Sequence, residues 1–354
     1  MQNLHGSRKS LKFEGNARKL ALAWQLLFLA HWIVQVCSTY TRLQYSSPGR
    51  RIYLPDRDCF FLGGGLCEEE LRIESCRRLC FIDGAQMRKY WHVIGIGIQN
   101  NLTYRVNYLA RTLFSFIPLF AMLSLWRTIY ANKVAGSALG GYTKSEMIFY
   151  YLLVAVVDVL TAVNEDDWQI AADIREGSIS QFLLKPIDYL WYRLCLFVSG
   201  RIAFISMACV PLAAFLFFFR DFVAPPASGT AFAAFAISVV LTALLQFFVS
   251  YTMAMLAFWM LEISTFIFIL FAFEFIASGH LFPLDLLPPA LQHALYFTPF
   301  PSMLYTPIGI YMGKIAGTGV WHGLLMQLLW LLLAYGLARF MWNRGIRKYA
   351  AFGG

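Results

Sequence analysis

Long apolar stretches separated by short polar intervals make up most of the chain from residue 87 onward. A helix rises about 1.5 Å per residue, so about 20 apolar residues cross the roughly 30 Å hydrocarbon core of a bilayer. Helices also satisfy their own backbone hydrogen bonds inside lipid. We therefore expect an all-α, polytopic membrane protein with six transmembrane helices, at residues 106–126, 146–164, 192–219, 229–258, 261–279 and 319–342.

The composition favours a membrane protein and argues against one that binds nucleic acid. Hydrophobic residues make up 59% of the 354 residues, and charged residues only 14%. The formal net charge is +9, but a basic excess in a polytopic protein usually reflects cytoplasmic loops that face anionic lipid. The sequence has no basic run with interleaved aromatic residues. We expect membrane lipid as a partner, and no nucleic acid.

Basic residues are distributed unequally between the two sides of the predicted spans. From residue 87 onward, twelve Lys and Arg residues fall on one side and five on the other. Because cytoplasmic loops carry the excess of Lys and Arg, both termini of the six-span unit are expected in the cytoplasm. The interval between the second and third spans is then cytoplasmic, and the long interval before the last span lies outside.

Residues 1–86 differ in character from the six-span unit, residues 87–354. They contain 12 of the 29 Lys and Arg residues and one apolar stretch, residues 20–37, that is just long enough to span a bilayer. We treat them as an N-terminal extension. An alternative is that Met87 is the natural start, because the sequence that follows it is basic and amphipathic, as at a cytoplasmic surface.

The interval between the second and third spans, "IREGSISQFLLKPIDYL" (174–190), predicts two short helices. The first ends at Gly177, and the second begins with a capping box formed by Ser178 and Gln181. The second helix places Ile179, Phe182 and Leu183 on one stripe and ends at Pro186. With only Arg175 and Lys185 as basic neighbours, such an amphipathic helix fits a groove on a protein partner better than a lipid surface.

Residues 278–314, here called the proline-rich segment, precede the last span and are nearly as apolar as the spans. They contain six of the 13 prolines of the chain, which exclude one continuous helix. We expect short helices that dip into the outer leaflet, with their backbone groups buried in protein or facing water. An outer loop that packs on the bundle without a role in gating remains the alternative.

Two acidic side chains, Asp158 and Glu274, fall inside predicted spans. A charge near the bilayer centre costs about 3 kcal/mol on insertion scales, so such residues are candidates for contact with a transported substrate. Both lie near a span end, and snorkelling or pairing inside the bundle would explain them equally well.

Catalytic motifs give little support for an enzyme. The sequence lacks a phosphate-binding P-loop and the patterns HExxH and GxSxG. The stretch "HLFPLD" (280–285) matches the HxxxxD spacing of membrane acyltransferases, in which a His activated by an Asp deprotonates a hydroxyl. No basic cluster follows it, and the predicted orientation places it away from acyl-thioester donors. A membrane-embedded acyltransferase is therefore a disfavoured alternative.

Four stretches resemble, in order, the membrane subunit of ABC transporters of the ABC-2 type. They are "IREGSISQFLLKPIDYLWYRL" (174–194), "SGHLFPLDLLPPALQ" (278–292), "PFPSMLYTPIGIYMGK" (299–314) and "RGIRKYAAFGG" (344–354). The resemblance covers about residues 87–354. It implies a six-span permease in the bacterial inner membrane, paired with a second permease, either identical or related. It also implies a separate ABC ATP-binding subunit that carries ATP and magnesium, so that this chain binds no cofactor and is not itself an enzyme.

The resemblance further implies roles for individual residues. The family's coupling helix docks on the ATPase and corresponds here to the coupling segment, residues 174–187, with Ile174, Arg175, Glu176, Gly177, Ile179, Phe182, Leu183 and Pro186 as contacts. The family's short outer helices, which help to close the exit, correspond to residues 280–313, and the candidate residues around their start are Gly279, Phe282, Pro283, Leu284, Asp285 and Pro288.

The implied function is ATP-driven export of a hydrophobic or amphipathic substrate. ATP binding would draw two ATPase subunits together and move the coupling segments with them. A channel or scaffold that needs no ATPase is the other alternative, and failure of an ATPase to co-purify would favour it.

Overall fold

The computed structural model describes residues 84–103, 105–131, 138–163, 166–185, 187–260 and 262–349, and within these ranges every regular element is a helix. The predicted all-α class is therefore confirmed. The apolar stretch 20–37 and almost all of the N-terminal extension lie outside the described residues. The α-helices are α3 (Gly84–Thr103), α4 (Arg105–Ala131), α5 (Lys144–Thr161), α6 (Asp166–Arg175), α7 (Ile179–Leu183), α8 (Tyr189–Phe218), α9 (Gly229–Ala254), α10 (Ser264–Ala277), α11 (Pro289–Tyr296), α12 (Tyr305–Tyr311) and α13 (Thr318–Lys348). Short 3-10 helices are η1 (Arg220–Phe222), η2 (Met255–Phe258), η3 (Leu284–Leu286) and η4 (Phe300–Met303).

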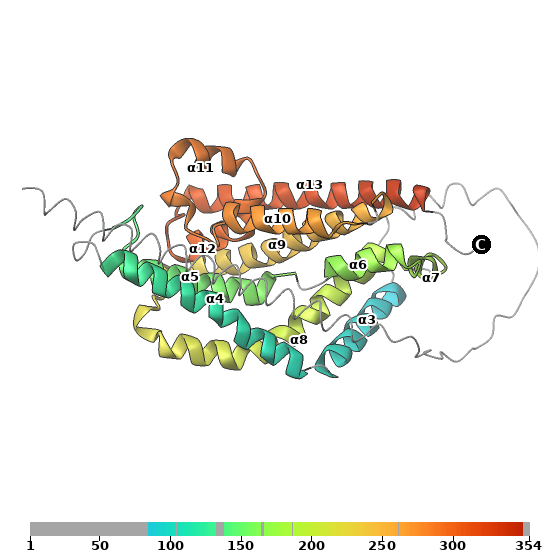
Figure 1. Ribbon diagram of the computed structural model, residues 1–354, viewed down its shortest axis with the longest axis horizontal. Coiled ribbons are helices and arrows are strands. Elements are labelled where there is room, and N and C mark those ends of the chain that lie inside the picture. The colour runs from blue at the N-terminus through green and yellow to red at the C-terminus, as the bar shows by residue number, and fades with distance from the viewer. Residues whose placement is uncertain are drawn as a thin grey trace, which may run out of the picture.

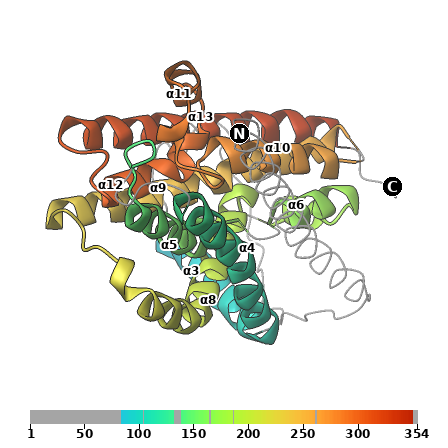
Figure 2. The ribbon, with the colours of Figure 1, turned by 60° about the vertical axis from the view of Figure 1, so that its left-hand side comes forward.

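The long helices form a bundle with different short helices at its two ends. Helices α9, α10 and α13 lie along the longest axis of the molecule, with α6 and α7 towards one end and α11 and α12 towards the other (Figure 1). The view in Figure 2 shows α13, α9 and α12 on one side of α5, and α3 and α8 on the other. The most extensive contacts between helices are those of α9 with α13 and of α3 with α8.

Four of the six predicted spans correspond to helices that are long and apolar enough to cross a membrane. These are Thr112–Ala131, Tyr189–Phe218, Gly229–Phe258 and Thr318–Lys348. The predicted spans 146–164 and 261–279 correspond to α5, with 18 residues, and α10, with 14. At 1.5 Å per residue they are about 27 Å and about 21 Å long. Helix α5 also carries three charged residues, Lys144, Glu146 and Asp158.

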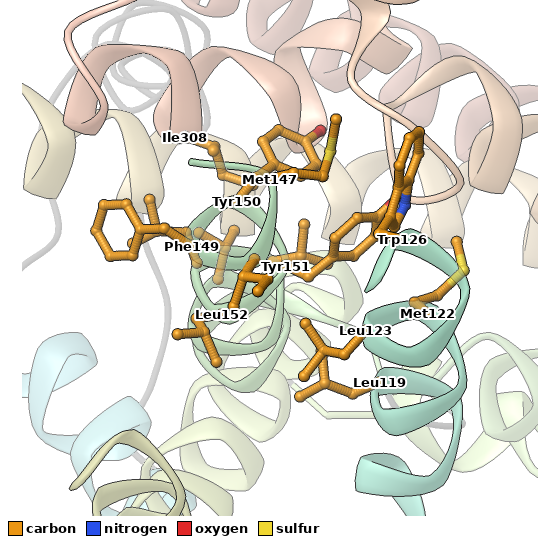
Figure 3. Packing of buried hydrophobic residues seen from close by; sticks show 14 of the residues in the cluster. Leu119, Met122, Leu123, Trp126, Met147, Phe149, Tyr150, Tyr151, Leu152 and Ile308 are labelled. Carbon is orange, nitrogen blue, oxygen red and sulfur yellow. The ribbon is translucent and has the colours of Figure 1, made fainter. Parts of the chain in front are cut away.

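Helix α5 is the centre of the larger core. Ten of its 18 residues are buried, and they lie on all sides of the helix rather than on one stripe. Residues of α4 and Ile308 of α12 pack against it, as Figure 3 shows with Leu119, Met122, Leu123, Trp126, Met147, Phe149, Tyr150, Tyr151 and Leu152. A helix that is hydrophobic all round is a core helix, so α5 is held within the bundle by protein.

A second core lies at the α7 end of the bundle. It joins α6, α7 and the beginning of α8 to the last turns of α9 and α13, through Ile170, Ile174, Ile179, Leu190, Tyr251 and Ala338 among others. The short helices α6 and α7 are thus fixed to the ends of three long helices.

Candidate functional site

The coupling segment consists of two short helices that meet at Gly177. Helix α6 ends at Arg175, and α7 runs from Ile179 to Leu183. Gly177 has a φ of +79°, a left-handed conformation that favours glycine. Its carbonyl accepts a hydrogen bond of 3.2 Å from the hydroxyl of Tyr349, which follows α13. The predicted break at Gly177 is therefore present.

The predicted capping box is absent. Ser178 has helical backbone angles, φ −60° and ψ −22°, and its side chain makes no capping bond. A cap residue needs an extended backbone to turn its hydroxyl towards the third amide of the helix. The turn is closed instead by Ser180, whose hydroxyl donates to the carbonyl of Gly177 at 2.7 Å.

The apolar residues of the segment divide into a buried set and an exposed pair. Ile174 and Ile179 are buried in the second core. The ring of Phe182 is half-buried between Tyr189 and Tyr192, with centroid distances of 5.4 Å and 4.9 Å. The ring therefore packs in part on the following helix, and the contact of Phe182 with an ATPase stays a prediction.

The exposed pair is Leu183 and Leu184, whose exposed fractions are 49% and 89%. The sequence analysis missed Leu184 because this residue does not lie on the apolar stripe of the predicted helix. Helix α7 ends at Leu183, so helical periodicity does not predict the orientation of Leu184. Arg175 and Glu176 are exposed beside the pair, whereas Pro186 lies outside the described residues.

An ionic network fixes the coupling segment to the bundle. Arg193 of α8 forms an ion pair with Asp173 of α6, and Tyr189 donates to the same carboxylate at 2.8 Å. Asp188 accepts from the amide of Leu190 at the start of α8 and binds Arg339 of α13 at 2.6 Å. Helices α6, α8 and α13 are thus connected immediately beside α7.

At the other end, the proline-rich segment contains η3, α11, η4 and α12, so the predicted series of short helices is present. Pro288 and Pro289 precede and begin α11, and Pro299 precedes η4. Among the candidate residues, Pro283 and Leu284 are buried, Phe282 packs against the larger core, and Pro288 is exposed.

Helix α5 is attached to the proline-rich segment by tyrosine hydroxyls. Tyr150 donates to the carbonyl of Gly279 at 2.7 Å, and Tyr151 donates to the carbonyl of Leu281 at 2.6 Å. Gly279 has a φ of +101°, and a Cβ atom there would lie 2.7 Å from the Tyr150 hydroxyl. Only glycine therefore fits the close approach of this backbone to α5.

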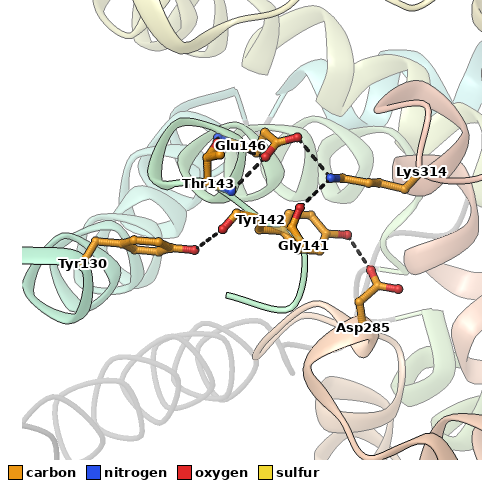
Figure 4. A network of polar contacts seen from close by, with 7 residues as sticks. All are labelled: Tyr130, Gly141, Tyr142, Thr143, Glu146, Asp285 and Lys314. Atoms are coloured by element: carbon orange, nitrogen blue, oxygen red, sulfur yellow. Dashed lines mark hydrogen bonds and ion pairs between the residues drawn. The ribbon is translucent and has the colours of Figure 1, made fainter. Parts of the chain in front are cut away.

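Asp285 accepts two further tyrosine hydroxyls. Tyr142, just before α5, donates to Oδ2 at 2.6 Å, and Tyr305 of α12 donates to Oδ1 at 2.7 Å. Burial and the hydrogen bond to Asp285 raise the pKa of Tyr142 above its ordinary range, so the phenol stays protonated and donates. Beside it, Lys314 binds the carbonyl of Gly141 at 2.8 Å and the carboxylate of Glu146 at 3.0 Å (Figure 4).

Of the two acidic residues predicted inside spans, Asp158 pairs directly with His280. Asp158 Oδ1 of α5 is 3.0 Å from His280 Nε2, and the Ser278 hydroxyl is 2.7 Å from His280 Nδ1. Glu274 of α10 interacts electrostatically with both His280 and Asp158. Pairing inside the bundle, one of the two explanations for Asp158, is thus supported by its contact with His280, a partner that the sequence alone could not identify.

The His and the Asp of the HxxxxD pattern each bind residues outside that pattern. His280 pairs with Asp158, and Asp285 binds Tyr142 and Tyr305. Ser278, which completes a Ser-His-Asp arrangement, is fully buried, so a substrate could not reach its oxygen as it would a nucleophile. In the part of the chain that the structure describes, no group of three His, Cys, Asp or Glu residues is placed to hold a metal ion.

The chain was compared with known protein families and with curated proteins. The model of a family described as ABC-2 family transporter protein matches residues 116–353, which include helices α5 to α13 and most of α4. The search of curated proteins found no match. The match covers more than half of the chain, and it agrees with the four helices of spanning length. This multi-pass membrane protein belongs to the ABC-2 family of transporter proteins, whose members are the membrane components of transporters that work with an ATP-binding partner.

Proposed function

We propose that the chain is the permease subunit of an ATP-driven exporter, and that it is coupled to a separate ATPase through residues 174–187. The observation that supports this most directly is the exposed pair Leu183 and Leu184 at the tip of the bundle. Two leucines exposed beside charged residues are typical of a short helix that inserts into a groove on a partner.

The proposed contact residues differ from those that the sequence alone favours. Leu183 and Leu184 enter the groove on the ATPase. The charged residues Arg175, Glu176 and Lys185 contact the rim of that groove. Phe182 and Ile179 act through packing, because they hold α7 against Tyr189 and the second core. Gly177 provides the turn that lets α7 project from the end of α6.

The permease has six spans in this proposal, with α5 and α10 completing the four longer helices. Both are shorter than the average bilayer core is thick, and α5 is surrounded by protein. The α7 end faces the cytoplasm and the proline-rich segment faces outwards. Two permeases form the pathway, and the second is either identical or related.

Movement of the ATPase is transmitted to the outer end through α5. Helix α6 follows α5 in the chain after residues 162–165, and the tyrosines of α5 hold the proline-rich segment. ATP and magnesium are bound by the partner, and their binding shifts the pair of permeases between two conformations. The substrate is hydrophobic or amphipathic, in keeping with the aliphatic and aromatic faces of the spans.

The experiment is co-purification from the native membrane in mild detergent. The unaltered chain should carry an ATPase and stimulate it, and Leu184→Asp should lose at least about tenfold of the association, which is about 1.4 kcal/mol. Leu184→Met keeps the apolar contact and should retain the ATPase. Gln181→Asp adds the same charge to an exposed polar position of α7 and controls for charge alone.

The outcomes separate the alternatives. Loss of the ATPase from Leu184→Asp, at normal membrane levels, supports docking through the leucine pair. Equal association of Leu184→Asp and the unaltered chain would place the contact elsewhere. No ATPase in any preparation would favour a channel or scaffold.

A further inference from the structure

We propose that protonation of His280 controls its contact with Asp158, and that this contact fastens the proline-rich segment to α5. His280 belongs to the segment, Asp158 to α5 and Glu274 to α10, so the three side chains come from separate elements. The contact goes beyond the transport function, because it is a property of this chain without its partners.

The distances within the contact indicate which atoms carry the hydrogens. An ionised carboxylate only accepts, so Nε2 of His280 carries the hydrogen that reaches Asp158 across 3.0 Å. The Ser278 hydroxyl, 2.7 Å from Nδ1, can accept from a protonated ring or donate to a neutral one. Both hydrogen bonds therefore survive loss of the proton, and the charge of the ring is what changes.

The charge of the ring matters because its charged neighbours are acidic. Asp158 of α5 contacts the ring, Glu274 of α10 adds an electrostatic interaction with the ring, and Tyr150 interacts electrostatically with Asp158. On its remaining side the ring of Phe275 stacks on His280 at 5.4 Å between centroids. When His280 is protonated, its charge is paired with the carboxylate of Asp158 at 3.0 Å. When it is neutral, Asp158 keeps the hydrogen bond but loses the attraction of a cation.

Because of the position of His280, its contact with Asp158 affects how the proline-rich segment is attached to α5. The carbonyls on either side of it, those of Gly279 and Leu281, are held by Tyr150 and Tyr151. These phenol bonds do not change between about pH 6 and about pH 8, whereas a histidine does. A histidine that is bound more tightly when protonated contributes its stabilisation at low pH and loses it as the pH rises through its own pKa.

The test is hydrogen exchange on the full-length protein in lipid nanodiscs, without an ATPase. The reporters are the amide of Leu281, which donates to Phe275 of α10, and the amides of Leu286 and Leu287, which donate within the segment to Pro283 and Leu284. From about pH 6 to about pH 8 their protection, corrected for intrinsic exchange, should fall about tenfold. Protection of the α13 amides should stay constant.

Variants test whether the pH response of hydrogen exchange arises from the imidazole ring of His280. His280→Gln keeps a neutral donor and should reduce the pH response, whereas His293→Gln, on the exposed face of α11 in the same segment, should leave it unchanged. If His280→Gln fails to fold, Asp158→Asn serves instead, and it should reduce the response. A response unchanged in His280→Gln or Asp158→Asn, or absent from the unaltered protein, would overturn the proposal. Because no ATPase is present, these outcomes are independent of whether the chain is an ATPase-coupled permease.

Discussion

At the scale of single residues, Gln327 shows how one polar side chain can join three elements inside the membrane. It is fully buried in α13, donates to the carbonyl of Ser302 at 2.8 Å and to Thr242 at 3.1 Å, and accepts from Ser238 at 2.9 Å. Gln327→Leu removes the acceptor of the Ser238 hydroxyl, whereas Thr242 still donates to the carbonyl of Ser302 at 3.1 Å. Since interhelical hydrogen bonds in membranes contribute about 0.6 to 1.7 kcal/mol each, we expect a loss of about 1 to 2 kcal/mol in the free energy of unfolding.

The measurement is a double-mutant cycle with Ser238→Ala in detergent unfolding experiments. The two substitutions should be less than additive, because each removes the same bond. Strict additivity would mean that the bond between Gln327 and Ser238 contributes nothing. The sequence analysis missed Gln327 because it considered only ionisable residues inside spans, and a lone glutamine has no sequence pattern that distinguishes a bonded from an exposed side chain.

At the scale of elements, Asp285 joins the start of the proline-rich segment to Tyr142, just before α5, and to α12 of the same segment. Hydrogen bonds to a charged group contribute about 1.5 to 3 kcal/mol each. The double variant Tyr142→Phe and Tyr305→Phe removes both hydroxyls from the carboxylate. It should therefore lower the thermal midpoint of the purified protein. Tyr311→Phe is the matched control, because its ring packs against Phe149 and Phe235, and an equal fall in both variants would contradict the prediction.

The elements themselves could be predicted in part from the sequence. Apolar length predicted six spans, of which four correspond to helices of spanning length, and the prolines predicted that the segment before α13 would be broken into short helices. The orientation of single side chains could not be predicted. Phe182 lies on the apolar stripe of α7, but its burial depends on Tyr189 and Tyr192, which belong to the next helix. Likewise, Ser178 has the sequence of a cap, but tertiary packing gives it helical backbone angles.

At the scale of the whole molecule, the coupling segment and α11 lie towards opposite ends of the bundle (Figure 1). The excess of Lys and Arg on the side of the coupling segment predicts that this end is cytoplasmic. The exposed residues Leu184 and Leu291, 89% and 52% exposed, provide one labelling position at each end. Each is changed to cysteine in a background that lacks the natural cysteines, and intact cells are treated with a maleimide that cannot cross membranes.

The expected result follows from the bilayer as a barrier to a charged reagent. Leu291→Cys should react in intact cells, whereas Leu184→Cys should react only after the membrane is permeabilised. The opposite labelling pattern would mean that the protein has the opposite orientation in the membrane. It would also place the leucine pair out of reach of a cytoplasmic ATPase, so that the proposed coupling would fail together with the orientation. Labelling of both positions from outside would mean that the two ends are not separated by a bilayer, and it would contradict the predicted orientation.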